Sequence, residues 1–136
     1  LCISLMGHIC EMAWNQGDDF YGFDNNRFLK ACEYTAKYNV AKLAVPFKEY
    51  TRNYQDPWGG CTYADKHTEI STAGRGTVRP MWEIVYNHYV KRKGLTATYT
   101  TLGAQTVRPE GGGGDYGPNS GGYDQLGFGT LLYSLD

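Results

Sequence analysis

The stretch Arg79-Pro-Met-Trp-Glu-Ile-Val-Tyr-Asn-His-Tyr89 carries the most information about this chain. Proline is favoured in the first turn of a helix, and aromatic residues recur here at i, i+4 and i+7. We therefore expect a helix from near Pro80 to about Lys93. The stretch then places a positive charge, two phenols, an amide and an imidazole on or beside one short helix. Arginine grips a carboxylate at two points, and tyrosine can transfer a proton, so the stretch offers the groups needed to cleave an acidic sugar polymer by elimination.

Apolar residues repeat with helical spacing elsewhere in the chain as well. The pattern predicts helices over residues 1–16, over 25–39 after Asp24 as N-cap, and over 98–107. Residues 40–76 have no sustained period and are broken by proline and glycine, which indicates a long loop with, at most, short strands or turns. The tail from Phe128 reads as a strand or an extended docking segment. The predicted fold is mainly α, with a long irregular middle loop and an extended C-terminal tail.

The bulk composition limits the classes of function. With 136 residues, of which 41% are hydrophobic, the chain forms one domain at most and can bury a core. A formal net charge of −1 argues against a nucleic-acid or membrane-surface partner held by net charge, and no membrane span is visible. The four cysteines leave two disulfides and free thiols equally open. The chain has no CxxC pair and its three histidines are far apart, so we predict no metal site and no cofactor.

The chain begins inside an apolar segment, Leu1-Cys-Ile-Ser-Leu-Met6, without an initiator methionine at this point. We expect residues 1–136 to be either a single domain or, preferably, the C-terminal piece of a longer protein. The other possibility is that further helices come from a second copy of this chain or from a partner chain.

Arg79 and Tyr86 are the first candidates for catalysis. They are seven residues apart, so on one helix they would share a face and lie roughly 10 Å apart along its axis. A uronic acid ring bridges much of that distance, with the arginine at its carboxylate and the tyrosine at the neighbouring ring carbon. The alternative is structural, with Arg79 paired to Glu83 and Tyr86 in the core.

Asn15, His67 and His88 are weaker candidates. Asn15 closes the first helix and could donate to a substrate carboxylate, or it could simply end the helix. His67 lies in the long loop and could act as a base, although a surface histidine is the simpler interpretation. His88 could polarise the substrate or be a structural histidine.

Sugars stack on aromatic faces, and the chain has 12 tyrosines. Arg75 flanks the end of the long loop, where its charge could meet a substrate. We expect the other substrate contacts from Tyr21, Trp82, His88 and Tyr89. For any one tyrosine, filling the core is the alternative. In a non-catalytic protein, the stacking platforms would be Tyr21, Trp58, Trp82 and Tyr116.

Three stretches together resemble the C-terminal half of the alginate-lyase-type polysaccharide lyase superfamily. The first is Glu11-Met-Ala-Trp-Asn-Gln-Gly17 with residues 21–39, and the second is residues 74–89. The third is Arg108-Pro-Glu-Gly111 followed by Gln125-Leu-Gly-Phe-Gly-Thr-Leu131. The resemblance covers most of the chain and depends on the combination of the three. It implies part of an incomplete α/α toroid, in a secreted or extracellular protein that cleaves an acidic polysaccharide such as alginate or glucuronan by β-elimination.

The resemblance also implies roles for single residues. Asn15 resembles the asparagine that neutralises the uronate carboxylate, and Arg79 and Tyr86 resemble the arginine and the catalytic tyrosine. Tyr89 competes with Tyr86, because the order Tyr-Asn-His-Tyr leaves the alignment ambiguous by one turn. An upstream Asp-Gln-Gly-His-like motif of the family is not in this sequence, and His67 could substitute for its histidine.

The implied mechanism starts with removal of the proton at C5 of a uronate, which builds negative charge on the carboxylate. Donors at those oxygens, here the charge of Arg79 and a hydrogen bond from Asn15, would stabilise the transition state. Tyr86 would take the proton or deliver one to the leaving oxygen, and the product would be an unsaturated sugar. The rival interpretation is a non-catalytic carbohydrate-binding or structural fragment that forms one part of a larger assembly.

Overall fold

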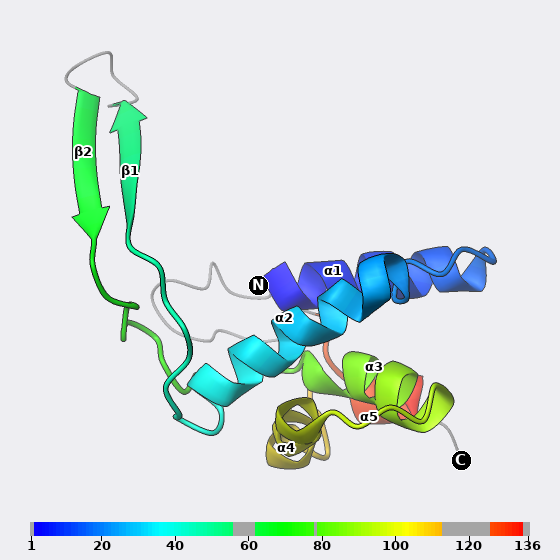
Figure 1. The fold of residues 1–136 in the computed structure, drawn as a ribbon. Helices are drawn as coiled ribbons and strands as arrows, with labels where there is room; N and C mark the ends of the chain where they lie inside the picture. The colour runs from blue at the N-terminus through cyan, green and yellow to red at the C-terminus, as the bar shows by residue number, and fades with distance from the viewer. Residues whose placement is uncertain (1, 56–61, 78, 113–125, 135–136) are drawn as a thin grey trace.

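The computed structural model describes residues 2–55, 62–77, 79–112 and 126–134. The protein is mainly helical, as predicted, and Figure 1 shows a body of packed helices from which a β-hairpin projects. In this view α1 (Cys2–Asn15) and α2 (Phe23–Asn39) run in opposite directions above the later helices.

α1 agrees with the helix predicted over residues 1–16. Its buried face is formed by Ile3, Ser4, Gly7 and Cys10. A Cβ on Gly7 would lie 3.2 Å from the side chain of Ile84, so this glycine allows α1 to approach α3 closely. The other face carries four large apolar residues that are 45% to 64% exposed: Leu5, Met6, Ile9 and Met12. α1 is therefore apolar on two faces, and the described part of the chain covers one of them.

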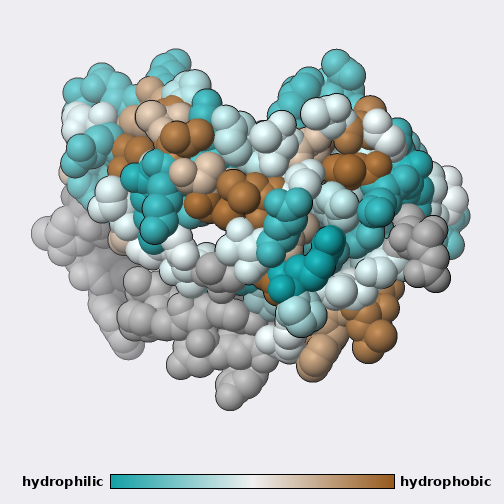
Figure 2. Space-filling view, turned by 90° about the horizontal axis from the view of Figure 1, so that it is seen from below, coloured by the Kyte–Doolittle hydropathy of each residue, from teal (hydrophilic) through white to brown (hydrophobic). Residues whose placement is uncertain are grey.

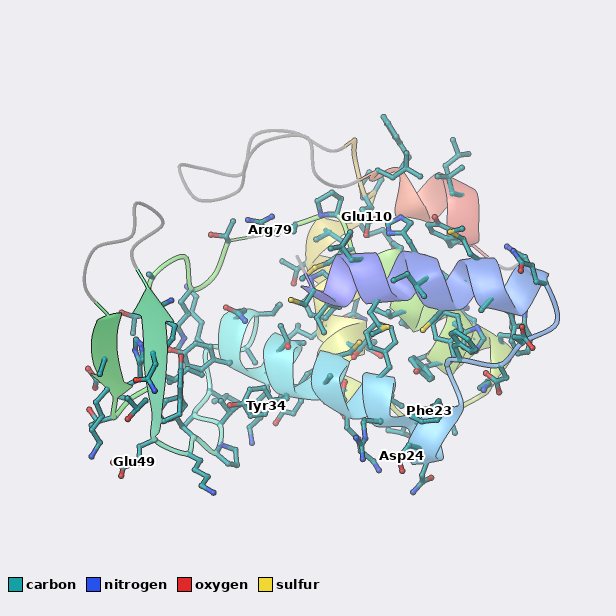
Figure 3. All side chains as sticks on the ribbon, turned by 90° about the horizontal axis from the view of Figure 1, so that it is seen from above. Phe23, Asp24, Tyr34, Glu49, Arg79 and Glu110 are labelled. Carbon is teal, nitrogen blue, oxygen red and sulfur yellow. The ribbon has the colours of Figure 1, made fainter. Side chains whose placement is uncertain are left out.

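α2 begins differently from the prediction. Asp24 is not an N-cap, because Asp24, Asn25 and Asn26 form a left-handed turn with φ of 48°, 54° and 57° inside the helix. Asparagine and aspartate are the non-glycine residues that adopt this conformation most readily. The rest of α2 is regular and ends at Asn39, as predicted. Figure 3 places Phe23 and Asp24 at the end of α2 that is farthest from the hairpin.

The helix predicted from Pro80 to Lys93 is present in altered form. α3 (Trp82–Tyr86) starts after the proline and passes directly into a π-helical segment, η1 (Asn87–Arg92). Gly94, with φ of 65°, follows as the residue expected at a helix end. α4 (Thr98–Val107) has the predicted bounds. A Cβ on Gly103 would come within 2.7 Å of the indole of Trp82, so α4 rests directly on that ring.

The core lies where α1, α2 and the α3–η1 helix meet. Buried Cys10 and Cys32 belong to it, together with Val85 and Tyr89. Burial is the main reason why the pKa of each of these two thiols is raised. Cys2, Cys10 and Cys32 are free cysteines, and Cys61 lies outside the described residues.

The middle of the chain is more ordered than a long irregular loop. β1 (Tyr50–Gln55) and β2 (Thr62–His67) pair antiparallel, with Tyr50 opposite His67 and Gln55 opposite Thr62. Figure 1 shows this hairpin projecting from the helical body. The sequence analysis left short strands open here but did not locate them, because they carry polar residues on both faces, which hides the period of two on which strand prediction depends.

The prediction of an extended C-terminal tail is wrong for the described residues. α5 (Gly129–Tyr133) is a short helix that follows two left-handed residues, Gly127 and Phe128, with φ of 70° and 55°. The N–H of Phe128 donates to the carbonyl of Gly111 at 2.7 Å, which fixes the turn. Gly129 lies so close to the Glu110 side chain that a Cβ there would collide with it. The tail thereby packs against the start of α3.

Apolar residues also reach the surface on the lower side of the molecule. Figure 2 shows several such patches on that side, separated by polar residues. Exposed apolar residues of α4 and α5 include Leu102, Leu131 and Leu132. Among the described residues, no helix combines the length and the apolar character that a membrane crossing requires.

Candidate active site

The N-terminus of α3 is capped by a carboxylate from a distant segment. The backbone N–H groups of Trp82 and Glu83 donate to Oε2 of Glu110 at 3.2 and 3.1 Å. A carboxylate at this position satisfies free N–H groups and complements the positive end of the helix dipole. Burial raises the pKa of Glu110, and the two hydrogen bonds oppose that rise. The cap fixes the segment after α4 against the start of α3.

Glu83 is a buried carboxylate whose oxygens are satisfied by three neighbouring side chains. Arg108 donates from Nε to Oε1 at 2.6 Å and from Nη2 to Oε2 at 3.1 Å, in a two-point grip. Asn87 donates to Oε2 at 2.9 Å, and the hydroxyl of Thr130 donates to Oε1 at 3.3 Å. A carboxylate with no exposed surface requires partners of this kind. The network holds the guanidinium of Arg108 in one orientation.

The fixed guanidinium of Arg108 lies beside the ring of Tyr86. Its central carbon is 5.2 Å from the ring centre, which is the range of a cation–π contact. Tyr86 is half-buried, and the Arg108 side chain is 41% exposed, so both groups reach the surface of the helix. Glu83 uses two of the five N–H donors that a guanidinium carries, which leaves further donors on the same group. A phenol and a permanent positive charge therefore meet at an accessible place.

Arg79 does not share a helix with Tyr86. It precedes α3, and its carbonyl accepts a hydrogen bond from the N–H of Met81 at 3.0 Å in a turn. The seven-residue spacing therefore does not put the two side chains on one helical face, and that part of the prediction is wrong. Arg79 is half-buried, and Figure 3 places it between the hairpin and Glu110. Arg108, from the segment after α4, contacts Tyr86.

Tyr21 and Tyr89 lie in the core and have no exposed surface. The hydroxyl of Tyr89 donates to the carbonyl of Tyr21 at 2.8 Å, and the hydroxyl of Tyr21 donates to Glu11 at 3.0 Å. Desolvation is the main cause of the raised pKa of both phenols. The expectation that these rings contact substrate is therefore wrong for this structure, and Tyr89 is not a competing catalytic tyrosine here.

His88 is a structural histidine and does not contact substrate. This is the second of the two interpretations that the sequence allowed. It is 1% exposed, stacks on Tyr21 with ring centres 3.6 Å apart, and meets Trp14 edge-on at 4.8 Å. Arg92 donates to Nδ1 at 2.8 Å, so the proton of the neutral ring is on Nε2. Burial, followed by the charges of Arg92 and Lys93, lowers the pKa of His88 to about 4. The ring is neutral at pH 7 and out of reach of a substrate.

Asn15 is exposed as the last residue of α1. Its neighbour Trp14 contacts His88, and the cationic groups of Arg92 and Lys93 lie 5.2 and 5.8 Å from the indole centre. These contacts place the end of α1 beside the last turn of η1. Asn15 is accessible, but no contact among the described residues joins it to the Tyr86–Arg108 pair.

His67 belongs to β2 and not to the helical body. Its ring stacks on Tyr50 with centres 4.9 Å apart, and its Nε2 lies 3.3 Å from the carboxylate of Asp65. Figures 1 and 3 both show the hairpin standing apart from α3. The structure therefore does not bring His67 to Tyr86, and a role as its catalytic base is not supported by this geometry.

Arg75 and Trp82 have structural contacts instead of the expected substrate contacts. Arg75 donates from Nε to the carbonyl of Tyr38 at 3.0 Å and from Nη2 to that of Leu43 at 3.4 Å. It thus binds one carbonyl in the last turn of α2, where helical partners are missing, and one in the segment that follows the helix. Trp82 is 2% exposed, beneath Gly103. Two other proposed stacking residues lie outside the described part of the chain, Trp58 and Tyr116.

Two residues of this site, Arg108 and Glu110, receive no role from the sequence analysis. The sequence feature that could have identified them is the Arg108-Pro-Glu-Gly111 motif, which is part of the resemblance to the polysaccharide lyase superfamily. In the described ranges, no three His, Cys, Asp or Glu side chains are placed to hold a metal ion. Comparisons with protein-family models, curated proteins and solved structures gave no match. The functional argument therefore depends on the motifs and on the geometry of the site.

Proposed function

We propose that this chain forms part of a polysaccharide lyase that cleaves a uronate-containing polymer by β-elimination. The proposal depends above all on one observation, the contact between half-buried Tyr86 and the guanidinium of Arg108. Elimination next to a carboxylate needs a proton-transfer group and a positive charge in the same place. The motif resemblance to the alginate-lyase-type superfamily supports the same reaction class.

In the proposed mechanism Tyr86 removes the C5 proton or protonates the leaving oxygen. Arg108 would place a permanent positive charge beside the ring of Tyr86, and Glu83 would keep that charge oriented. Arg79 is the proposed partner of the substrate carboxylate. Its guanidinium would stabilise the charge that develops there in the transition state.

We further propose that the helical body is part of an incomplete α/α toroid. The antiparallel course of α1 and α2 supports this architecture, as does the packing of α3 and α4 below them (Figure 1). The uncovered apolar face of α1 is the kind of surface against which a further helix of such a toroid would pack.

The test is the formation of unsaturated sugar from alginate or glucuronan, followed by absorbance of the new double bond. Tyr86→Phe should remove the activity, because it deletes the proton-transfer group. The matched control is Tyr34→Phe, which deletes a surface phenol on α2 whose hydroxyl donates to the carbonyl of Pro46 at 2.7 Å. Full activity in Tyr86→Phe, or equal loss in the control, would contradict the proposal.

A second candidate function is a non-catalytic structural or carbohydrate-binding part of a larger assembly. It is favoured by a hollow of about 570 Å³ beside the exposed stripe of α1. The hollow lies between α1 and α2 and is lined by Met6, Cys10, Phe20, Phe23, Phe28 and others. Large exposed apolar surfaces commonly mark interaction sites. A dimer or larger species in light scattering, without product from any uronate polymer, would favour this candidate, whereas an active monomer would exclude it.

A further inference from the structure

A hollow of about 210 Å³ lies where the end of α2 and the turn at residues 74–77 meet the start of α3 and the end of α4. Figure 1 shows how the chain returns from β2 to α3 past this end of α2. Apolar side chains that include Val40, Trp82 and Val107 line part of this Lys42 hollow. The polar side chains that line it are Asn39, Lys42, Thr77 and Thr106. A mainly apolar hollow with a few polar groups is the usual composition of a small-molecule site.

The backbone conformation of Lys42 is unusual for a lysine. Its φ of 58° is left-handed, a conformation that glycine normally adopts after the end of a helix. Gly76, with φ of 85°, lies opposite, and a Cβ there would be 3.5 Å from Cε of Lys42. A non-glycine residue in this conformation costs free energy, and such residues are concentrated at functional sites. The chain thus has a lysine where glycine would be less strained, which indicates a role for the side chain.

The charge in the Lys42 hollow is positive. Lys42 is the one charged residue among the described residues that line it, and its ammonium group has no ion pair or hydrogen bond within the described part of the chain. Arg75 adds a second positive charge in the adjoining turn, where its described partners are backbone carbonyls and include no carboxylate. Glu33 and Glu110, on neighbouring segments, already accept from N–H groups at the starts of α4 and α3. The hollow therefore favours an anionic group.

The other polar side chains can bond to hydroxyl groups. The hydroxyl of Thr106 donates to the carbonyl of Leu102 at 2.8 Å, so its oxygen can still accept. Asn39 donates through Nδ2 to the carbonyl of Thr35 at 3.0 Å, and its amide oxygen is a further acceptor. A ligand that combines a carboxylate, hydroxyl groups and a carbon ring matches this set, and a uronic acid unit has all three.

The Lys42 hollow adjoins the candidate active site. Trp82 and Tyr86 are four residues apart on α3, so they lie on the same side of the helix, one turn from each other. Val107 directly precedes Arg108, whose guanidinium contacts the ring of Tyr86. A sugar in the hollow would therefore be close to a sugar placed on Tyr86.

We propose that the Lys42 hollow binds one uronate unit of the polymer, adjacent to the unit on which Tyr86 acts, and that Lys42 holds its carboxylate. The identity of the ligand rests on the proposed function. The hollow is then a subsite that selects a uronate over a neutral sugar at this position.

The experiment measures binding of an alginate tetrasaccharide, and of the same tetrasaccharide with its carboxyl groups reduced, in a Tyr86→Phe background that does not cleave them. Lys42→Asn removes the charge and keeps a residue that tolerates the left-handed conformation. It should weaken binding of the charged tetrasaccharide at least about tenfold, the value of roughly one charge-assisted hydrogen bond, and leave binding of the reduced one unchanged. Urea unfolding should show no loss of stability. Lys42→Arg keeps the charge and should bind like the background protein.

The matched control is Lys48→Asn, which removes the same charge from an exposed lysine that does not line the hollow. Three results would overturn the inference: unchanged binding of the charged tetrasaccharide by Lys42→Asn, an equal loss in Lys48→Asn, or a loss in Lys42→Arg as large as in Lys42→Asn. Failure of this inference can be separated from failure of the proposed function. If the wild-type protein forms product while Lys42→Asn binds normally, only the subsite is wrong. If the wild type forms no product and the background protein binds neither tetrasaccharide, both are wrong.

Discussion

Tyr86 and Tyr89 lie one turn apart on the continuous α3–η1 helix, yet their surroundings are opposite. Tyr89 has no exposed surface, and its hydroxyl is bonded to the carbonyl of Tyr21 at 2.8 Å. Tyr86 is half-buried, and the guanidinium of Arg108 lies 5.2 Å from its ring centre. The comparison teaches that burial and partners, more than spacing in the sequence, decide which of two phenols a substrate could reach.

The largest expected effect is that the same substitution lowers activity at Tyr86 and lowers stability at Tyr89. Tyr86→Phe should lower the rate of product formation by about 10²- to 10⁴-fold, the usual contribution of a proton-transfer group, and leave the melting temperature nearly unchanged. Tyr89→Phe should keep the rate and lose about 1–2 kcal/mol of stability, because a buried carbonyl loses its donor. Enzyme assays and denaturant unfolding of both variants measure this. The comparison fails if Tyr89→Phe is the inactive, fully stable variant.

A second test breaks the network that supports Tyr86. Arg108→Ala leaves the buried carboxylate of Glu83 without its positive partner, so we expect a loss of about 3 kcal/mol in the free energy of unfolding. The double variant Glu83→Gln/Arg108→Gln removes both charges and should recover part of that loss. Urea unfolding measures both. A change of less than about 0.5 kcal/mol in Arg108→Ala, the range of an ordinary surface substitution, would show that the pair does not hold the site together.

The buried ring of His88 should make stability depend on pH. The pKa of His88 is lowered from 6.5 to about 4, so the unfolded chain binds an extra proton between these values. This contribution is complete above pH 6.5 and is lost as the pH falls towards 4, by on the order of 3 kcal/mol. The charges that act on His88 are those of Arg92 and Lys93, which lower its pKa, and that of Asp19, which raises it.

The matched variant for this test is His88→Phe, which keeps a ring against Tyr21 and does not titrate. Unfolding of both proteins between pH 7 and pH 4 isolates the histidine from other groups, including Glu110, whose pKa is raised. We expect the difference in stability between the two proteins to change across this window. A constant difference would mean that His88 does not titrate as its burial requires.

The smallest expected effect concerns the packing of α4 on α3. Gly103→Ala places a Cβ within 2.7 Å of the Trp82 indole, and overpacking of this kind costs about 1–3 kcal/mol. Gly111→Ala is the matched control, because a Cβ there meets no atom of the described residues within 4 Å. Thermal unfolding should separate the two variants. Equal melting temperatures would show that the α3–α4 contact is looser than the structure indicates.

Much of the helical framework follows from the sequence. The bounds of α4 and the end of α2 were predicted, because apolar periodicity and terminal residues determine them locally. The short helix α5 was not, because it depends on left-handed Gly127 and Phe128 and on packing of Gly129 against Glu110. Such contacts join segments that are distant in the sequence, and local patterns carry no signal for them.

In the candidate site, too, local features were predicted and contacts between distant segments were not. Tyr86 was predicted from its motif, but its arginine was predicted as Arg79, on the assumption that the helix already includes that residue. The observed partner, Arg108, comes from the segment after α4 and is oriented by Glu83. Likewise, the sequence offers Tyr89 as a competitor of Tyr86, and only its packing against Tyr21 and Phe28 shows that Tyr89 is buried.

The most direct test of the central claim is the chemical nature of the product. The wild-type protein is incubated with alginate or glucuronan in water enriched in oxygen-18, and the fragments are analysed by mass spectrometry. Elimination through Tyr86 predicts fragments with unsaturated ends that contain no heavy oxygen, at a rate that falls sharply in Tyr86→Phe. Saturated fragments carrying heavy oxygen, or unsaturated fragments formed equally well by Tyr86→Phe, would contradict the account.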